Sequence, residues 1–132
     1  SRRLSMRSLR LEPMVLPAKD HGLRRIVDDA CLKAGFELNV VAEIDSLPNI
    51  KKAVLAGLAS TILSPCAVTE EVNEGLLKAT PIGPPTLLRR VVVSHSFNRP
   101  RSLAVMAVLE LAEQVIREMV RTKIWPARWV GA

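Results

Sequence analysis

Three polar turns carry the residues of this chain that are best suited to chemistry. The turns are Asp20-His21-Gly22, Asp45-Ser46 and Ser64-Pro65, and each of them directly precedes a stretch with helical character. The first turn of a helix holds unpaired N–H groups and a partial positive charge. Three such turns at one edge of a fold would therefore bind a small carboxylate or another anion.

All three turns leave alternatives open. His21 could add a charge or a hydrogen bond to the anion, and Gly22 would let a ligand approach the backbone closely. Equally, His21 could be a first-turn residue that points into solvent. Ser46 and Ser64 could contact the ligand or could only cap the helices that follow them.

Enzymatic and metal chemistry are not indicated by the sequence. It contains no Gly-x-Ser-x-Gly, phosphate-binding loop, dinucleotide or His-Glu-x-x-His motif, and its only histidines are His21 and His95. Cys31 and Cys66 lack the spacing of metal ligands and are expected to be small core residues. We therefore expect no enzyme, no metal site and no cofactor.

The elements that position these turns follow a repeated pattern. Gly35, Gly57 and Gly75 each precede a large apolar residue and are predicted to be left-handed residues after the last turn of a helix. The alternation of strand and helix predicts an α/β layer, with a mostly parallel sheet flanked by helices. In such a layer the strand-to-helix turns share one edge, which is where these sheets bind ligands.

Hydrophobic periodicity predicts the individual elements. The predicted strands lie at 13–17, 38–42 and 60–63, a further extended piece at 76–82, and the longest β-rich run at 87–94. The predicted helices lie at about 21–34, after Ser46, after Ser64-Pro65, and at about 102–121. Asp20 is expected to cap the first helix, whose polar face would hold Arg24. The run at 38–42 is almost wholly apolar and is expected to be covered on both faces.

Length and charge limit the class of protein. A chain of 132 residues with 48% hydrophobic residues is predicted to be one globular domain or a large part of one. It has no apolar stretch of membrane length and no signal-peptide pattern, so a cytoplasmic location is expected. The net charge of +6 is concentrated at the ends, and there is no tyrosine to build a base-stacking surface. Residues 1–12, which include Arg2, are therefore expected to be a poorly ordered basic leader rather than a DNA-binding arm.

Three blocks of the chain also resemble a known family. They are LPAKDHGLR at 16–24, VAEIDSL at 41–47 and GLASTILSP at 57–65. In this order and approximate spacing they are similar to the effector-binding domain of LysR-type transcriptional regulators, and most similar to members related to nitrogen assimilation regulators. The resemblance extends from about residue 13 to about residue 121. It implies a two-lobed fold like that of type 2 periplasmic binding proteins, with a small inducer between the lobes.

The resemblance also implies a division of the chain and a set of ligand contacts. Residues 13–86 would form the second lobe, 87–121 the crossover strand and C-terminal helix of an incomplete first lobe, and 122–132 a tail. The chain departs from the family in lacking a helix-turn-helix and the first half of the first lobe, and in having Ala59 and Ser60 at the pocket floor. The implied ligand contacts are Pro17, Ala18, His21, Gly22, Asp45, Ser46 and Ser64.

The expected function is that of a regulatory domain that senses a small anionic metabolite, with a carboxylate as the expected effector. The resemblance implies a homo-oligomer that contacts DNA only through a helix-turn-helix outside this chain, and no membrane partner. Three other classes stay open: a lobe of a secreted solute-binding protein, an oligomerisation module whose last helix seeks a partner, and an esterase-like enzyme.

Overall fold

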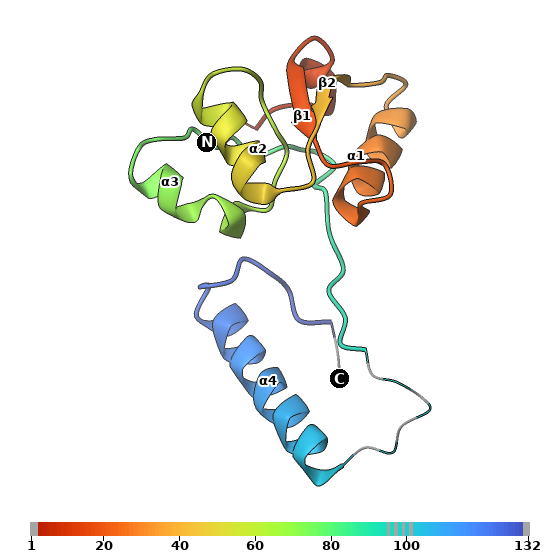
Figure 1. Cartoon of the computed structure of the whole chain (residues 1–132), viewed down its shortest axis with the longest axis vertical. Helices are drawn as coiled ribbons and strands as arrows, with labels where there is room; N and C mark the ends of the chain where they lie inside the picture. The colour runs from red at the N-terminus through yellow and green to blue at the C-terminus, as the bar shows by residue number, and fades with distance from the viewer. Residues whose placement is uncertain (1–2, 95, 97, 99, 101, 131–132) are drawn as a thin grey trace. The chain divides into compact units, whose positions relative to one another are not determined.

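The computed structural model describes residues 3–94, 96, 98, 100 and 102–130, so Arg2 and His95 lie outside the described residues. The chain divides into two compact units, Ser1–Arg90 and Val91–Ala132. Figure 1 shows the helices and strands of both units.

Strand β1 (Pro13–Leu16) lies at the centre of the first unit. It is parallel to β2 (Asn39–Glu43), and the register pairs Met14 with Val40 and Leu16 with Glu43. On its other side, Met14 forms a single parallel bridge with Ser60. Met14 and Leu16 are fully buried. The predicted parallel α/β arrangement is therefore present, but as a small sheet in which the strand expected at 60–63 contributes only one bridge.

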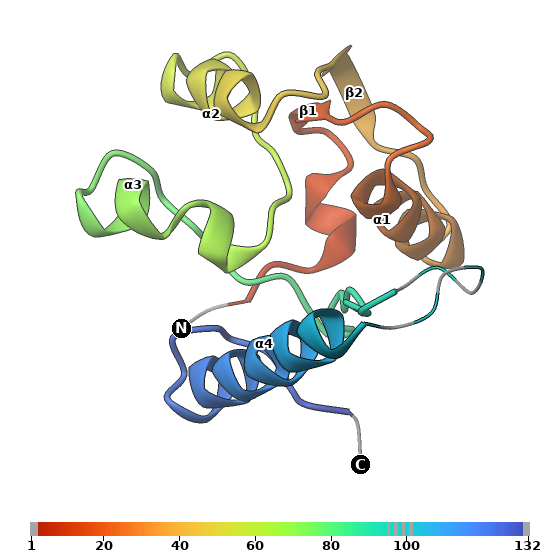
Figure 2. The same ribbon diagram turned by 60° about the horizontal axis from the view of Figure 1, so that its bottom comes forward.

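Two amphipathic helices lie on opposite sides of the strand pair, as both ribbon views show (Figures 1 and 2). Helix α1 (Gly22–Lys33) buries Val27 and Cys31, which are four residues apart and so share one face. Helix α2 (Leu47–Leu55) buries Ile50, whereas Leu47 at its start is 38% exposed. These two helices confirm the predicted periodicity.

The three glycines end helices as predicted. Gly35, Gly57 and Gly75 have φ values of 77°, 72° and 74°. After α1, the N–H of Phe36 donates to the carbonyl of Cys31 and the N–H of Gly35 donates to that of Leu32. The same pair of hydrogen bonds follows α2 and the short helix α3 (Thr69–Asn73). All three helices thus end in a Schellman motif, which requires a left-handed residue.

The basic N-terminal segment is part of the core, so the expectation of a poorly ordered leader is wrong for residues 3–12. Residues Met6–Leu9 form the 3₁₀ turn η1, and both Met6 and Leu9 are buried in the cluster that contains Met14 and Val27. Residues three apart lie on one face of a 3₁₀ turn, so the two apolar side chains point inward together. The neighbouring arginines remain at the surface: Arg7 donates to the carbonyl of Ala34.

Two predictions about strands also differ from the structure. Strand β2 is mostly exposed, with Val41 55% exposed, because it is an edge strand and nothing among the described residues covers its outer side. Residues 87–94 form no strand, and Val91, Val92 and Val93 are exposed. An extended segment becomes a strand only where another backbone supplies its hydrogen bonds, and the described part of the chain offers no such partner there.

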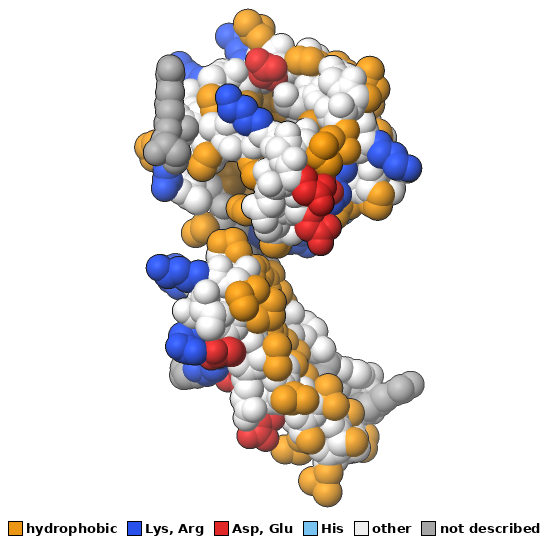
Figure 3. Space-filling view, turned by 90° about the vertical axis from the view of Figure 1, so that its left-hand side faces the viewer, with side chains coloured by type: hydrophobic (Ala, Val, Ile, Leu, Met, Phe, Trp, Pro, Cys, Tyr) orange, Lys and Arg blue, Asp and Glu red, His pale blue; other side chains and the backbone are white. Residues whose placement is uncertain are grey.

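The second unit contains α4 (Leu103–Arg121), the longest helix. Its first turn is capped by Ser102, whose Oγ accepts a hydrogen bond from the N–H of Val105. The residues after the helix fold back along it, with the guanidinium of Arg117 4.3 Å from the ring centre of Trp129. No residue of α4 is fully buried, and Figure 3 shows hydrophobic side chains running along the unit. Among the described residues, no helix has the length and apolar character needed to span a membrane.

Candidate functional site

A polar hollow opens at the N-terminus of α1 in the first unit. It has a volume of about 430 Å³ and is lined by Asp20, His21, Gly22, Asp45 and Arg89. Four of these residues come from the turns that follow β1 and β2, and Arg89 comes from the extended segment near the end of the unit. The parallel pairing of β1 and β2 brings the two turns to one edge, as the sequence predicted.

The first turn of α1 is capped by His21 and not by Asp20. The helix begins at Gly22, so the capping position falls on His21, whose Nδ1 accepts a hydrogen bond from the N–H of Leu23 at 3.2 Å. The expectation for Asp20 is therefore wrong by one residue. His21 is half-buried and does not simply point into solvent. Asp20 does not cap the helix; it is exposed and lines the hollow.

Asp45 connects the second turn to the first. Its Oδ1 accepts a hydrogen bond from the N–H of Ala18 at 2.9 Å. Close by, the N–H of Ile44 donates to the carbonyl of Leu16, the last residue of β1. These two bonds extend the β1–β2 pairing past the ends of the strands, so the two turns are held together at the hollow.

Arg24 lies behind this edge, and its role could not be read from the sequence, where it falls on the polar face of a helix. Its side chain is only 6% exposed, and it donates to Asp28, Glu43 and the carbonyl of Pro17. Burial lowers the pKa of the guanidinium, but the hydrogen bonds to Asp28 and Glu43 raise the pKa on balance, so the group stays charged. The only sequence signal was Asp28, one helical turn further on.

The two serines of the predicted site are not part of the hollow. Ser46 precedes α2 and Ser64 precedes the 3₁₀ turn η2 (Pro65–Ala67), but neither side chain makes a capping hydrogen bond. The Oγ of Ser64 lies 3.0 Å from the Sγ of Cys66, which is exposed. The expectation of a core residue is therefore confirmed for Cys31, which is buried, and wrong for Cys66.

The predicted contacts are thus brought together only in part. Ala18, His21, Gly22 and Asp45 gather at one edge, and Pro17, which precedes Ala18, is buried. Arg89 was not singled out by the sequence, because nothing in a run of extended residues indicates which of them will reach a distant turn. Within the described part of the chain, no group of three His, Cys, Asp or Glu residues could hold a metal ion.

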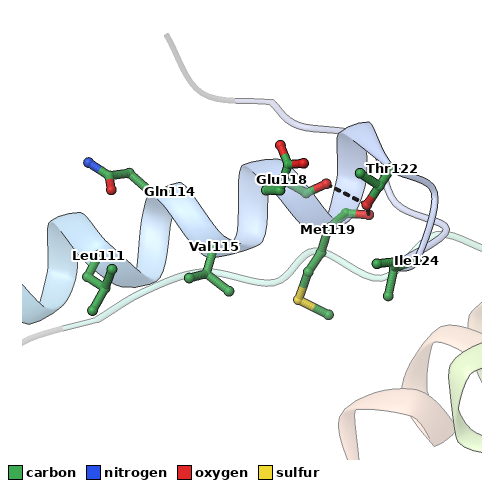
Figure 4. A pocket seen from close by; sticks show the side chains of 7 residues that line it. All are labelled: Leu111, Gln114, Val115, Glu118, Met119, Thr122 and Ile124. Atoms are coloured by element: carbon green, nitrogen blue, oxygen red, sulfur yellow. Dashed lines mark hydrogen bonds between the residues drawn. The ribbon is translucent and has the colours of Figure 1, made fainter.

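A second hollow, of about 350 Å³, lies on the second unit and has a different character. Leu111, Val115, Met119 and Ile124 point to one side of α4 and make it largely apolar (Figure 4). The dashed bond in that figure lies at the C-terminal end of α4, from Thr122 Oγ1 to the carbonyl of Glu118 at 2.7 Å. An apolar face on a single helix is typical of a packing surface rather than of a ligand site.

Comparison with known proteins agrees with the resemblance carried by the three blocks. The sequence pattern of the LysR substrate binding domain matches residues 1–117. The chain is 28% identical over 88 residues to two proteins named "Probable RuBisCO transcriptional regulator", from Trichormus variabilis and from a Nostoc species. The match covers 64% of this chain and 26% of each relative, so the chain spans about a quarter of their length. No solved structure matches the chain.

These findings confirm the main sequence prediction. The matched family has an α/β fold like that of periplasmic binding proteins, in keeping with the parallel strands and flanking helices of the first unit. The matched family is described as a substrate-binding domain, and both relatives are named as transcriptional regulators. With the match extending over 117 of 132 residues, the chain belongs to the LysR substrate-binding domain family.

Proposed function

We propose that this chain is the effector-sensing part of a bacterial LysR-type transcriptional regulator, and that the hollow at the N-terminus of α1 holds a small anionic metabolite. The observation that supports this most is the convergence of His21, Gly22, Asp45 and Arg89 on one polar hollow. A site for a small molecule needs only a few polar groups, provided that they come from different segments and converge on one place.

The chemistry of the hollow favours a carboxylate. The first turn of α1 and the guanidinium of Arg89 provide the positive charge, and an arginine can bind a carboxylate through two parallel hydrogen bonds. Asp20 and Asp45 line the same hollow and would repel a second negative charge. A monocarboxylate that also carries hydroxyl or amino donors for these two side chains is the ligand that matches the charges best.

The hollow is proposed to be one wall of a cleft between two lobes. In this proposal, residues 13–86 belong to the second lobe, and 87–121 supply the crossover segment and the last helix of the first lobe. The apolar face of α4 supports this division, since Val108, Leu111 and Val115 are between 50% and 66% exposed. An apolar helix face of this size normally packs against a sheet or another helix.

The proposed mechanism is a shift between open and closed lobes. A ligand that contacts both lobes stabilises the closed form relative to the open form by the difference between its binding free energies for the two forms. Closure would then reorient the subunits of a cytoplasmic homo-oligomer on DNA, through a helix-turn-helix outside this chain. Ser46 and Ser64 would take part only if closure moves them toward the hollow.

Calorimetric titration of the full-length regulator with a panel of small carboxylates tests this proposal. We expect at least one of them to bind, and Arg89→Met to weaken its binding by about tenfold or more, because the charged hydrogen bonds from the guanidinium to the carboxylate are lost. Arg90→Met is the matched control, because Arg90 is the next residue along, is exposed and does not line the hollow. Equal affinities of the two variants, or no binding by any carboxylate, would contradict the assignment.

The exposed face of α4 favours a second candidate, an oligomerisation module without ligand. Light scattering distinguishes the two if Leu111→Glu and Val115→Glu are compared with the unchanged chain. A ligand-binding domain would retain its carboxylate affinity in these variants, whereas a module that only assembles would lose its larger species and never bind the carboxylate.

A further inference from the structure

One peptide group at the edge of the hollow is held from both sides. The carbonyl of Pro17 accepts a hydrogen bond from Nη1 of Arg24 at 3.0 Å, and the N–H of Ala18 donates to Oδ1 of Asp45 at 2.9 Å. These two atoms belong to the same peptide unit, which is planar and trans, so its oxygen and its hydrogen point in opposite directions. Whatever fixes the oxygen therefore also aims the N–H.

Arg24 is itself held in one orientation. Its Nε donates to both carboxylate oxygens of Asp28 at 3.0 and 2.9 Å, and Nη1 donates to Glu43 at 2.9 Å. Asp28 lies on α1 and Glu43 is the last residue of β2, so the guanidinium joins the helix to the ends of both strands. A guanidinium is a rigid planar fork, and anchoring it at two places leaves the plane no freedom to turn.

We propose that Arg24 is a positioning residue that locks the orientation of the Pro17–Ala18 peptide and so holds Asp45 and the 18–22 turn in the arrangement that forms the hollow. The significance of this lock for ligand binding rests on the proposed function, but the lock itself does not. A lysine would not replace the arginine, because an ammonium group carries the charge without the fork that fixes the plane.

The direct test is the solvent-exchange rate of the Ala18 amide, measured by NMR in the full 132-residue chain. In Arg24→Met we expect this rate to rise about tenfold relative to that of the Phe36 amide. The reason is the loss of the hydrogen bond from Arg24 to the Pro17 carbonyl, which is of ordinary strength and holds the Pro17–Ala18 peptide in place. Phe36 is the internal reference, since its N–H bonds to Cys31 at the far end of the same helix and reports any general loosening. Arg24→Lys should give the same rise, and it replaces Arg24→Met if that variant fails to fold.

Arg25→Met is the matched control, because Arg25 is the neighbouring arginine on the same helix and is exposed. We expect its ratio of Ala18 to Phe36 exchange to equal that of the unchanged chain. A ratio that stays unchanged in both Arg24 variants would overturn the proposal, and so would restoration of the normal ratio by lysine.

A separate titration keeps this proposal distinct from the proposed function. Sodium acetate is added to the same proteins and the shift of the Gly22 amide is followed. If the effector site is correct, we expect Arg24→Met to weaken acetate binding about tenfold through the misplaced turn. If acetate binds to Arg24→Met as tightly as to the unchanged chain although Ala18 exchange has risen, the lock does not serve the hollow and that part of the proposal fails. An absence of binding by the unchanged chain counts against the effector site alone, while the exchange ratio still decides the lock.

Discussion

The same substitution, glycine to alanine, should have opposite effects at the two ends of α1. Gly35 ends the helix with φ at 77°, and Gly22 begins it outside the left-handed region. A Cβ added at either position would meet no atom within 4 Å apart from its chain neighbours and the adjacent helix backbone. Any difference between the two variants must therefore come from the backbone conformation and not from packing.

The expected magnitudes follow from this geometry. A left-handed alanine costs about 1–2 kcal/mol, which is partly offset because alanine also reduces the freedom of the unfolded chain by about 0.4–1 kcal/mol. Gly35→Ala should thus lower the free energy of unfolding by about 1 kcal/mol, or the melting temperature by about 4–8 °C for a unit of this size. At Gly22 only the effect on the unfolded chain operates, so Gly22→Ala should raise the free energy of unfolding by about 0.4–1 kcal/mol.

Thermal unfolding followed by far-ultraviolet circular dichroism measures both variants without any ligand. Gly57→Ala serves as a second test, since Gly57 has a φ of 72° and equally open surroundings, and it should behave like Gly35→Ala. If Gly35→Ala proved as stable as the unchanged chain, or if Gly22→Ala and Gly35→Ala shifted the melting temperature in the same direction, the Schellman termination of α1 would be refuted.

Three further predictions concern other parts of the chain. Lys51 on α2 forms an ion pair with Glu71 on α3 and donates to the carbonyl of Ala67, and its hydrogen bond holds the pKa of Glu71 below the usual range. The stabilisation by this ion pair is fully present above the usual pKa of a glutamate and is lost as the pH falls through the lowered pKa of Glu71. Acid, high salt or Lys51→Met should therefore speed hydrogen exchange in residues 65–77. An equally large increase of exchange in α1 would count against the prediction. Cys66 is exposed, whereas Cys31 is buried, and burial, with a smaller contribution from Asp28, raises the pKa of the Cys31 thiol. A thiol reagent at pH 8 should therefore modify Cys66 rapidly and Cys31 only on unfolding. Equal modification rates of the two cysteines would contradict the burial of Cys31 in the core. Finally, Arg117→Met should remove the contact with Trp129 and increase the quenching of tryptophan fluorescence by acrylamide, whereas Arg121→Met, on the same helix, should not.

The elements that could be predicted from sequence are those determined by local patterns. Helices α1, α2 and α4 follow from apolar residues three and four apart, and their ends follow from glycine or from a serine cap. The meeting of the turns after β1 and β2 was also predictable, because parallel strands place their carboxyl ends at one edge.

The features that escaped prediction depend on partners far away in the sequence. In the sequence, Arg24 has the neighbours of a surface arginine, because its partner Glu43 lies nineteen residues further along the chain. The run at 87–94 has the composition of a strand, but composition does not supply a second backbone to pair with. Asp20 was predicted to cap α1, but His21 does so. A helix boundary predicted from sequence is uncertain by one or two residues, and an error of one residue is enough to confuse the capping residue with one that lines the hollow.

The central claim, that the hollow at the start of α1 binds a small carboxylate, is tested most directly by an NMR titration of this chain. Monocarboxylates with and without hydroxyl or amino groups would be added at millimolar concentration, which suits weak binding to one wall of a cleft. We predict that the amide shifts concentrate on Ala18, Gly22 and Leu23. Arg89→Met should raise the carboxylate concentration needed to produce them about tenfold, while Arg90→Met should not. Shifts spread over the surface, or shifts that are the same in both arginine variants, would contradict the account.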